Sequence, residues 1–338
     1  MKTKEALDQT NSISDMTNDS DKLNLESLSD QDLLQLARQS YKRNLSEVTN
    51  AAQAELTKRG ISFNPSENPI PQGGWLHRLL GLAPPKLPVT SEEKDWIEES
   101  FLWLMNDLGT GLLSSPIILP TAEFFPDPYA GQREDVMPML VRLCEYMSVD
   151  PDTLKLEFYS ESRDEYLRTL PFYEGQKVGS AGHYRIRKGK QIIGIETSQL
   201  SNTTSLVATL AHELGHAILL GEDRLSSTED DHEPLTDLLT VYYGLGIFSA
   251  NSAFQFSQFE SGGYQGWRAQ TNGYLSEQMF GYALAVYAWI RGETKPAWYK
   301  YLDDGVKVYC QNSLKYLEMT NDSLLIKGMV SDDFADDD

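Results

Sequence analysis

The spacing of apolar residues near the N-terminus predicts two short helices. The first follows Ser29, and the second follows Ser46, which is placed as its cap, and stops at Gly60. We therefore expect a helical hairpin over residues 27–60. It is too small to hold a large core alone. It is either a module for docking or self-association, or an appendage packed on the rest of the chain.

Beyond residue 90 the pattern mixes two periods. Residues 154–158 alternate like a half-buried strand, and the runs 183–187 and 192–195 flank Lys188-Gly189-Lys190 as a hairpin does. Helical spacing predicts the other elements, which are a helix from Thr90 or Ser91 through Met105 and helices near 133–148, 202–220, 233–248, 275–291 and 303–317. Strands followed by helices are the order of an α+β domain, which we place at 90–320.

Three segments lack such periodicity. Residues 1–26 are polar and predict a disordered tail, and residues 321–338 end in an acidic tail. Residues 61–89 are rich in proline and predict a linker. Within it, the apolar turn Trp75–Leu80 pins the linker to the main body or binds a partner. Residues 27–80 are therefore the place where we expect a protein partner.

Charge and cysteine content narrow the classes of function. The formal net charge is −21, which argues against binding to nucleic acid and against docking on anionic membranes. The two cysteines, Cys144 and Cys310, stand in apolar helical stretches, as buried thiols do in a reducing compartment. No apolar signal segment follows Met1, and no apolar run is long enough to cross a membrane. These features predict a cytoplasmic protein.

The sequence His212-Glu213-Leu214-Gly215-His216 carries the strongest chemical signal. It matches H-E-x-x-H, in which two histidines four residues apart share one helix face and bind one zinc ion. Glu213 would then be the general base beside the metal. A catalytic zinc ion takes three protein ligands and keeps an open position for water. A third ligand must therefore come from another element.

The helix predicted at 233–248 offers that ligand. Glu233 and Asp237 are four residues apart, and acidic groups among apolar residues need a compensating partner. We expect Glu233 to be the third ligand and Asp237 to accept a hydrogen bond from a ligand histidine. Asp237 and His232 remain the rival third ligands. Calcium binding in the acidic loop before this helix is a weaker alternative.

HELGH followed by Glu233-Pro-Leu-Thr-Asp237 resembles the gluzincin metallopeptidases, which combine HExxH with Glu-x-x-x-Asp. The short motif is also similar to that of metallopeptidases that cleave phage repressors. The metzincin pattern fails, because Glu222 stands where a third histidine would be. The gluzincin resemblance implies a zincin-like domain, with a small mixed sheet packed on the HExxH helix and a helical C-terminal half. It implies one zinc ion on His212, His216 and Glu233, with Asp237 orienting His212.

A longer resemblance covers most of residues 90–320. The segments 119–127, 232–241 and 281–285 are similar to a family of uncharacterised bacterial proteins. This similarity indicates one coherent catalytic domain and supplies no substrate.

We therefore predict a zinc-dependent peptidase, an endopeptidase that hydrolyses peptide bonds of an unknown intracellular protein or peptide. Glu213 would accept the proton of the attacking water, and a nearby side chain would stabilise the oxyanion. The strand 192–195 is expected at a sheet edge, where an extended peptide could pair with it. The candidates for the oxyanion donor are His183, Tyr242, Tyr243, Tyr264 and Tyr274.

The alternative is a zinc-stabilised regulatory or adaptor protein without turnover. The hairpin, the linker and the polar ends suit an adaptor. Glu213 argues against it, because a structural zinc site gains little from a base and usually has four closed ligands.

Overall fold

The computed structural model describes residues 25–64, 84–160, 182–187, 190–221, 224–225, 232–260 and 275–330, with the backbone alone at 254–260. The predicted tail before residue 25, most of the predicted linker and the acidic end after residue 330 lie outside the described residues. The apolar turn Trp75–Leu80 lies outside them as well.

The described residues form a mostly helical structure with one three-stranded sheet, so the α+β prediction is confirmed at that level. The strands are β1 (Leu154–Tyr159), β2 (Gly182–Arg187) and β3 (Lys190–Glu196). Their order is β1-β3-β2, with β1 parallel and β2 antiparallel to β3. The prediction that residues 192–195 form a sheet edge is therefore wrong. A hairpin places β2 on one side of β3, and β1 occupies the other side.

The two faces of the sheet differ because successive side chains of a strand point to opposite faces. In β2, Gly182 and Tyr184 face helix α9 (Thr203–Leu219), since a Cβ on Gly182 would lie 2.5 Å from the methyl carbon of Thr209. His183 lies on the other face, where its ring covers Gly194 of β3.

Helix α9 is the centre of the structure. The side chain of Asn202 caps its first turn by accepting from the N–H of Ser205. The sheet packs on one side, and α7 (Arg133–Met147), α10 (His232–Tyr242) and α11 (Gly246–Glu260) pack on the others. Every residue from Ser205 to Leu219 is buried. The helix predicted at 202–220 is therefore confirmed, although it is enclosed all round instead of lining an open cleft.

The helix predicted over 233–248 is two helices in the structure. Helix α10 ends at Tyr242, and Gly244 turns the chain with a φ of 78°. Backbone at positive φ suits glycine, which has no Cβ to clash. The N–H of Leu245 returns to the carbonyl of Thr240 and closes the turn before α11. Apolar residues continue through this turn, so their spacing alone does not show the break.

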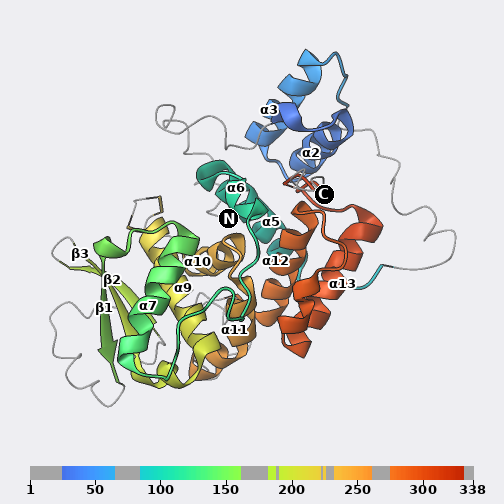
Figure 1. Ribbon diagram of the computed structural model, residues 1–338. Coiled ribbons are helices and arrows are strands. Elements are labelled where there is room, and N and C mark those ends of the chain that lie inside the picture. Colours follow the sequence, from blue (N-terminus) through green and yellow to red (C-terminus); the bar gives the residue numbers. More distant parts are fainter. Residues whose placement is uncertain are drawn as a thin grey trace, which may run out of the picture.

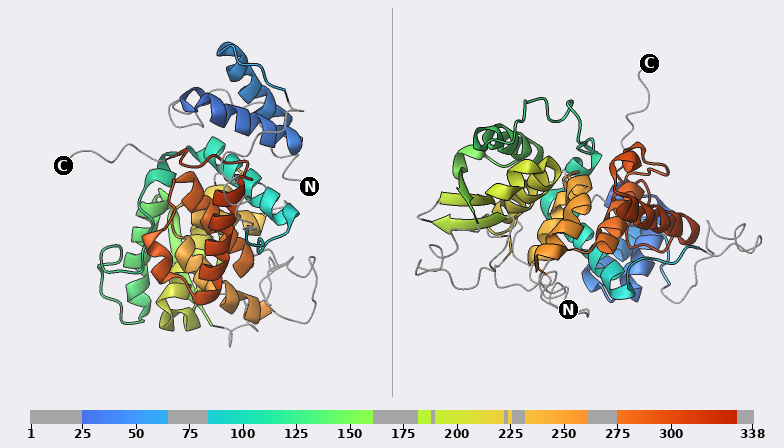
Figure 2. Two further views of the ribbon diagram at one scale, coloured as in Figure 1. Left: turned by 90° about the vertical axis from the view of Figure 1, so that its right-hand side faces the viewer. Right: turned by 90° about the horizontal axis from the view of Figure 1, so that it is seen from below.

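The N-terminal hairpin consists of α2 (Asp30–Lys42) and α3 (Ser46–Lys58). Ser29 caps α2 as the pattern requires, but Ser46 is the first residue of α3 and forms no cap. Figures 1 and 2 show the hairpin at one end of the molecule, beside α5 (Ser91–Leu108) and the C-terminal segment. Arg43, just after α2, reaches Glu98 of α5 at 2.8 Å. The hairpin is thus packed against the main body.

The helical C-terminal part lies on the side of α10 and α11 away from the sheet (Figures 1 and 2). It consists of α12 (Glu277–Ile290) and α13 (Asp304–Thr320), which pack closely at Gly281. None of the helices in the described part of the chain is long and apolar enough to cross a membrane. The remaining short helices are η1 (Leu25–Ser27), α6 (Gly111–Ser114), η2 (Pro151–Thr153), η4 (Thr197–Ser201) and η5 (Ala297–Tyr301).

Candidate metal centre

Helices α9 and α10 approach each other closely at Gly215. A Cβ at this position would lie 2.7 Å from the methyl carbon of Thr236 on α10, which is too close for any side chain. Glycine inside the HExxH motif therefore serves helix packing. The close approach brings the motif histidines on α9 to the first turn of α10.

Three side chains converge between these helices. The Nε2 atom of His212 lies 3.0 Å from Oε2 of Glu233, and the Nε2 atom of His216 lies 3.4 Å from the same oxygen. One ligand atom from each residue lies within 4.8 Å of the others. Two donors bound tetrahedrally to one zinc ion at 2.0–2.1 Å lie about 3.3 Å apart. The observed separations fit that donor set.

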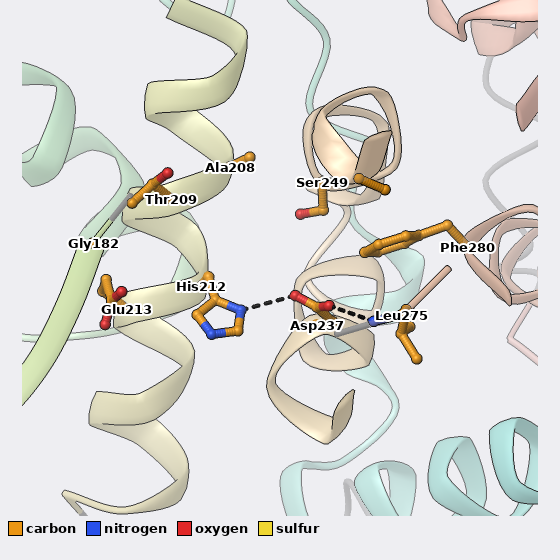
Figure 3. Close-up of a pocket in the computed structure, with 10 residues that line it drawn as sticks. Gly182, Ala208, Thr209, His212, Glu213, Asp237, Ser249, Leu275 and Phe280 are labelled. Carbon is orange, nitrogen blue, oxygen red and sulfur yellow. Dashed lines mark hydrogen bonds and ion pairs between the residues drawn. The ribbon is translucent and has the colours of Figure 1, made fainter. Parts of the chain in front are cut away.

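The other ring nitrogen of His212, Nδ1, is held by a hydrogen bond to Asp237. The Nδ1 atom lies 2.8 Å from Oδ1 of Asp237, so the Nδ1–H donates to this carboxylate and a metal ion would bind at Nε2, where it would displace the second proton. The second oxygen of Asp237 accepts from the backbone N–H of Leu275 at 2.8 Å (Figure 3). Asp237 thereby connects the histidine to the chain just before α12.

His216 has a weaker partner on its Nδ1 side. The hydroxyl of Thr236 lies 3.4 Å from Nδ1 and donates its own proton to the carbonyl of His232. Its oxygen is therefore oriented to accept from Nδ1–H. The ring of Tyr184 stacks beside His216, with centroids 6.1 Å apart. Both motif histidines thus have neighbours that orient them, as metal-binding histidines usually do.

The two rival third ligands take other positions. Asp237 lies at the Nδ1 side of His212, as expected for a residue that orients a ligand. His232 lies 3.3 Å from the other carboxylate oxygen of Glu233, with Nε2 facing Oε1. Within the described residues, the group that can hold a metal ion consists of His212, His216 and Glu233.

The electrostatics of the cluster favour a cation. Burial acts to lower the pKa of His212, but its hydrogen bonds to Asp237 and Glu233 outweigh burial and raise the pKa well above its ordinary value. Burial acts to raise the pKa of Glu233, but hydrogen bonds from the three surrounding histidines lower it far below its ordinary range. Burial and the neighbouring His212 lower the pKa of His216. Two carboxylates, the buried Asp237 and the partly exposed Glu233, therefore face the imidazoles.

Glu213 lies on the same helix but points toward β2. Its side chain is 4% exposed, and its Oε1 would be 2.7 Å from a Cβ on Gly182. Among the described residues, Oε2 has no hydrogen-bond partner. Burial raises the pKa of Glu213 to about 8. A metal ion bound at the neighbouring histidines would lower this pKa again, so that the unpaired oxygen could accept a proton from a water molecule.

A small pocket opens beside Glu213 (Figure 3). Its volume is about 30 Å³, room for about two water molecules. It is lined by Gly182, Ala208, Thr209, His212, Glu213, Asp237, Ser249, Ala253, Leu275 and Phe280.

None of the three described candidates for an oxyanion donor lines this pocket. His183 lies on the opposite face of the sheet, because it follows Gly182 by one residue, and its ring packs 5.0 Å from that of Tyr159. The hydroxyl of Tyr242 donates to the carbonyl of Gly109, and Tyr243 packs on Tyr242. The remaining candidates, Tyr264 and Tyr274, lie outside the described residues.

Sequence reasoning missed three residues that shape the site. Thr209 lies one turn before Glu213 on the same helix face, a spacing that could have revealed it. Gly182 and Tyr184 reach α9 through the pairing of β2, which no local pattern encodes.

Comparisons with protein-family models, with curated proteins and with solved structures found no match to this chain. The resemblance to gluzincins therefore rests on the residues of the two motifs.

Proposed function

We propose that this protein is a zinc-dependent peptidase with a zincin-like domain, in which His212, His216 and Glu233 hold the metal ion. The observation that carries the proposal is the convergence of these three donors beside the buried, unpaired carboxylate of Glu213. A set of two imidazoles and one carboxylate with a neighbouring base is the arrangement of a hydrolytic zinc site.

The chain's own residues supply the proton chemistry. A zinc ion in this site would lower the pKa of a water molecule toward about 7 and polarise the substrate carbonyl. Glu213 accepts the proton of the attacking water on its unpaired Oε2 and returns it to the leaving amine. Asp237 holds the His212 ring so that its Nε2 atom stays available.

The substrate peptide is expected along β2. In the described part of the chain, β2 pairs with β3 on one side and with no strand on the other. An extended peptide can pair with the backbone of such an edge. At Gly182 the edge comes within contact of Glu213, because no side chain separates strand and helix. A peptide on β2 would pass the base.

The unpaired carboxylate of Glu213 favours a catalytic zinc site over a purely structural one. Burying a carboxylate without a partner costs stability, and a structural site would gain nothing from it. Cys144 and Cys310, the ligands that structural zinc sites prefer, are both buried elsewhere and do not join the group.

The test combines zinc content with cleavage of a randomised peptide library. We expect one zinc ion per chain and defined cleavage sites for the wild-type protein. Glu213→Gln keeps the zinc ion but loses cleavage by at least about a hundredfold, because the general base is gone. Glu134→Gln, which changes an exposed glutamate on α7, is the matched control and retains activity. Stoichiometric zinc without cleavage by the wild type would favour the adaptor alternative, and full activity of Glu213→Gln would show that the base is assigned wrongly.

A further inference from the structure

The pocket beside Glu213 extends along α9 toward α11 and α12. Its walls near β2, α9 and α11 carry small residues, and its far side is closed by the larger Leu275 and Phe280 (Figure 3). The lining residues with small side chains, or none, are Gly182, Ala208, Thr209, Ser249 and Ala253. A space for about two water molecules accommodates a side chain of two or three non-hydrogen atoms.

Two polar atoms in this pocket have no hydrogen-bond partner among the described residues. They are Oε2 of Glu213 and the hydroxyl oxygen of Thr209, whose side chain is only 3% exposed. The pocket's other hydroxyl, on Ser249, is bonded to Thr240 at 2.7 Å. Buried hydroxyls are nearly always paired, so an unpaired one indicates a partner that arrives from outside.

We propose that this pocket is the specificity subsite, and that it takes a small, hydroxyl-bearing side chain, serine or threonine, next to the scissile bond. This inference rests on the proposed peptidase function. The Thr209 hydroxyl bonds the substrate hydroxyl. Leu275 and Phe280 exclude leucine and larger residues by volume.

Threonine and valine side chains have the same shape, but only threonine has a hydroxyl. Comparing the two therefore tests the hydrogen bond to Thr209, while the volume of the side chain stays the same. Cleavage of the randomised library first gives a sequence that the protein cuts. Four peptides are then made from it, with serine, threonine, valine or leucine at the subsite position. We expect kcat/KM to be about tenfold higher for threonine than for valine, and at least about tenfold lower again for leucine.

Thr209→Val removes the hydroxyl while keeping the volume. It is expected to bring the threonine-to-valine ratio of kcat/KM to about one, whereas Thr209→Ser keeps the ratio. Thr203→Val, on the exposed first turn of the same helix, is the matched control and also keeps it. The zinc content and the unfolding transition of each variant establish that it is folded. If Thr209→Val does not fold, the threonine-to-valine ratios of kcat/KM for the wild type and for Thr209→Ser still test the subsite.

The outcomes separate the two proposals. No cleavage of the library by the zinc-loaded wild type overturns both the peptidase function and the subsite. Cleavage without preference for threonine over valine, or a ratio unchanged in folded Thr209→Val, overturns the subsite and leaves the peptidase standing. In that case the pocket holds only water.

Discussion

Glu98 and Glu213 are both buried carboxylates on helices, and their surroundings are opposite. Glu98 on α5 is fully buried, and both its oxygens are bonded. Oε2 accepts from Arg43 at 2.8 Å and from the N–H of Leu324 at 2.7 Å, while Oε1 accepts from the Tyr282 hydroxyl and lies 3.4 Å from Lys94. In contrast, Glu213 keeps one oxygen without a partner in the described structure.

The difference separates a carboxylate that holds the fold together from one that is available for chemistry. The bonds to Glu98 on α5 join the turn of the N-terminal hairpin, α12 and the segment after α13. A buried charge of this kind is stable because it is paired and hydrogen-bonded. Glu213 forgoes such compensation, and that is the signature expected of a functional group. Substitutions at Glu98 should therefore lower the stability of the protein, whereas substitutions around Glu213 should lower its activity.

The largest effect is expected for Glu98→Gln. It leaves the charges of Arg43 and Lys94 without their shared carboxylate, which costs about 3–5 kcal/mol of unfolding free energy. Denaturant unfolding measures it. Glu92→Gln, an exposed change on the same helix, should stay within about 0.5 kcal/mol. Equal stability of the two variants would contradict the structural role assigned to Glu98.

Gly182→Ala should reduce peptide cleavage without disturbing the hydrogen bonds of Glu98. The added Cβ would lie 2.5 Å from the Thr209 methyl carbon and 2.7 Å from Oε1 of Glu213. We expect peptide cleavage to fall about a hundredfold, since a displacement of about 1 Å at a catalytic group has this effect. Zinc content should not change. Gly111→Ala meets nothing within 4 Å and serves as the control. Full activity of Gly182→Ala would refute the position assigned to the base.

Asp237→Asn tests the support of the metal ligands. Asparagine can keep the shape but loses the charge that holds the Nδ1–H of His212. Zinc affinity, measured by competition with a chelator, should fall about tenfold to a hundredfold. A change of less than about twofold would indicate that Asp237 does not orient the ligand.

The smallest effect concerns His183, on the sheet face away from the site. Burial lowers its pKa from 6.5 to about 4, so the folded protein holds it neutral while the unfolded chain takes up a proton below pH 6.5. Stability is therefore full above pH 6.5 and falls as the pH drops toward 4. Allowing for partial exposure, the loss attributable to His183 between pH 7 and 5 is about 1 kcal/mol.

The comparison of wild type with His183→Gln isolates the contribution of His183 to the pH dependence of stability, because the other titrating groups are common to both. The variant should lose less stability on acidification and should retain zinc and peptide cleavage. Lost zinc binding in this variant would mean that His183 belongs to the site after all.

The sequence predicts those features of the structure that depend on the spacing of nearby residues. The 3.6-residue period predicts α9, and the four-residue separation of His212 and His216 places both on one face. The same spacing relates Glu233 to Asp237. Pairing between distant segments is not encoded locally. The central position of β3 and the face on which His183 lies follow from the order β1-β3-β2, and the contact of Gly182 with Glu213 follows from the packing of β2 on α9.

The proposed function depends on one zinc ion bound by His212, His216 and Glu233. X-ray absorption at the zinc edge of the purified protein tests it most directly, because it reports the donor atoms. We expect one zinc ion per chain with two imidazole nitrogens, carboxylate and solvent oxygen at about 2.0–2.2 Å, and no sulfur. Protein that binds no stoichiometric zinc, or zinc with a sulfur ligand at about 2.3 Å, would show that these three residues do not form a zinc site.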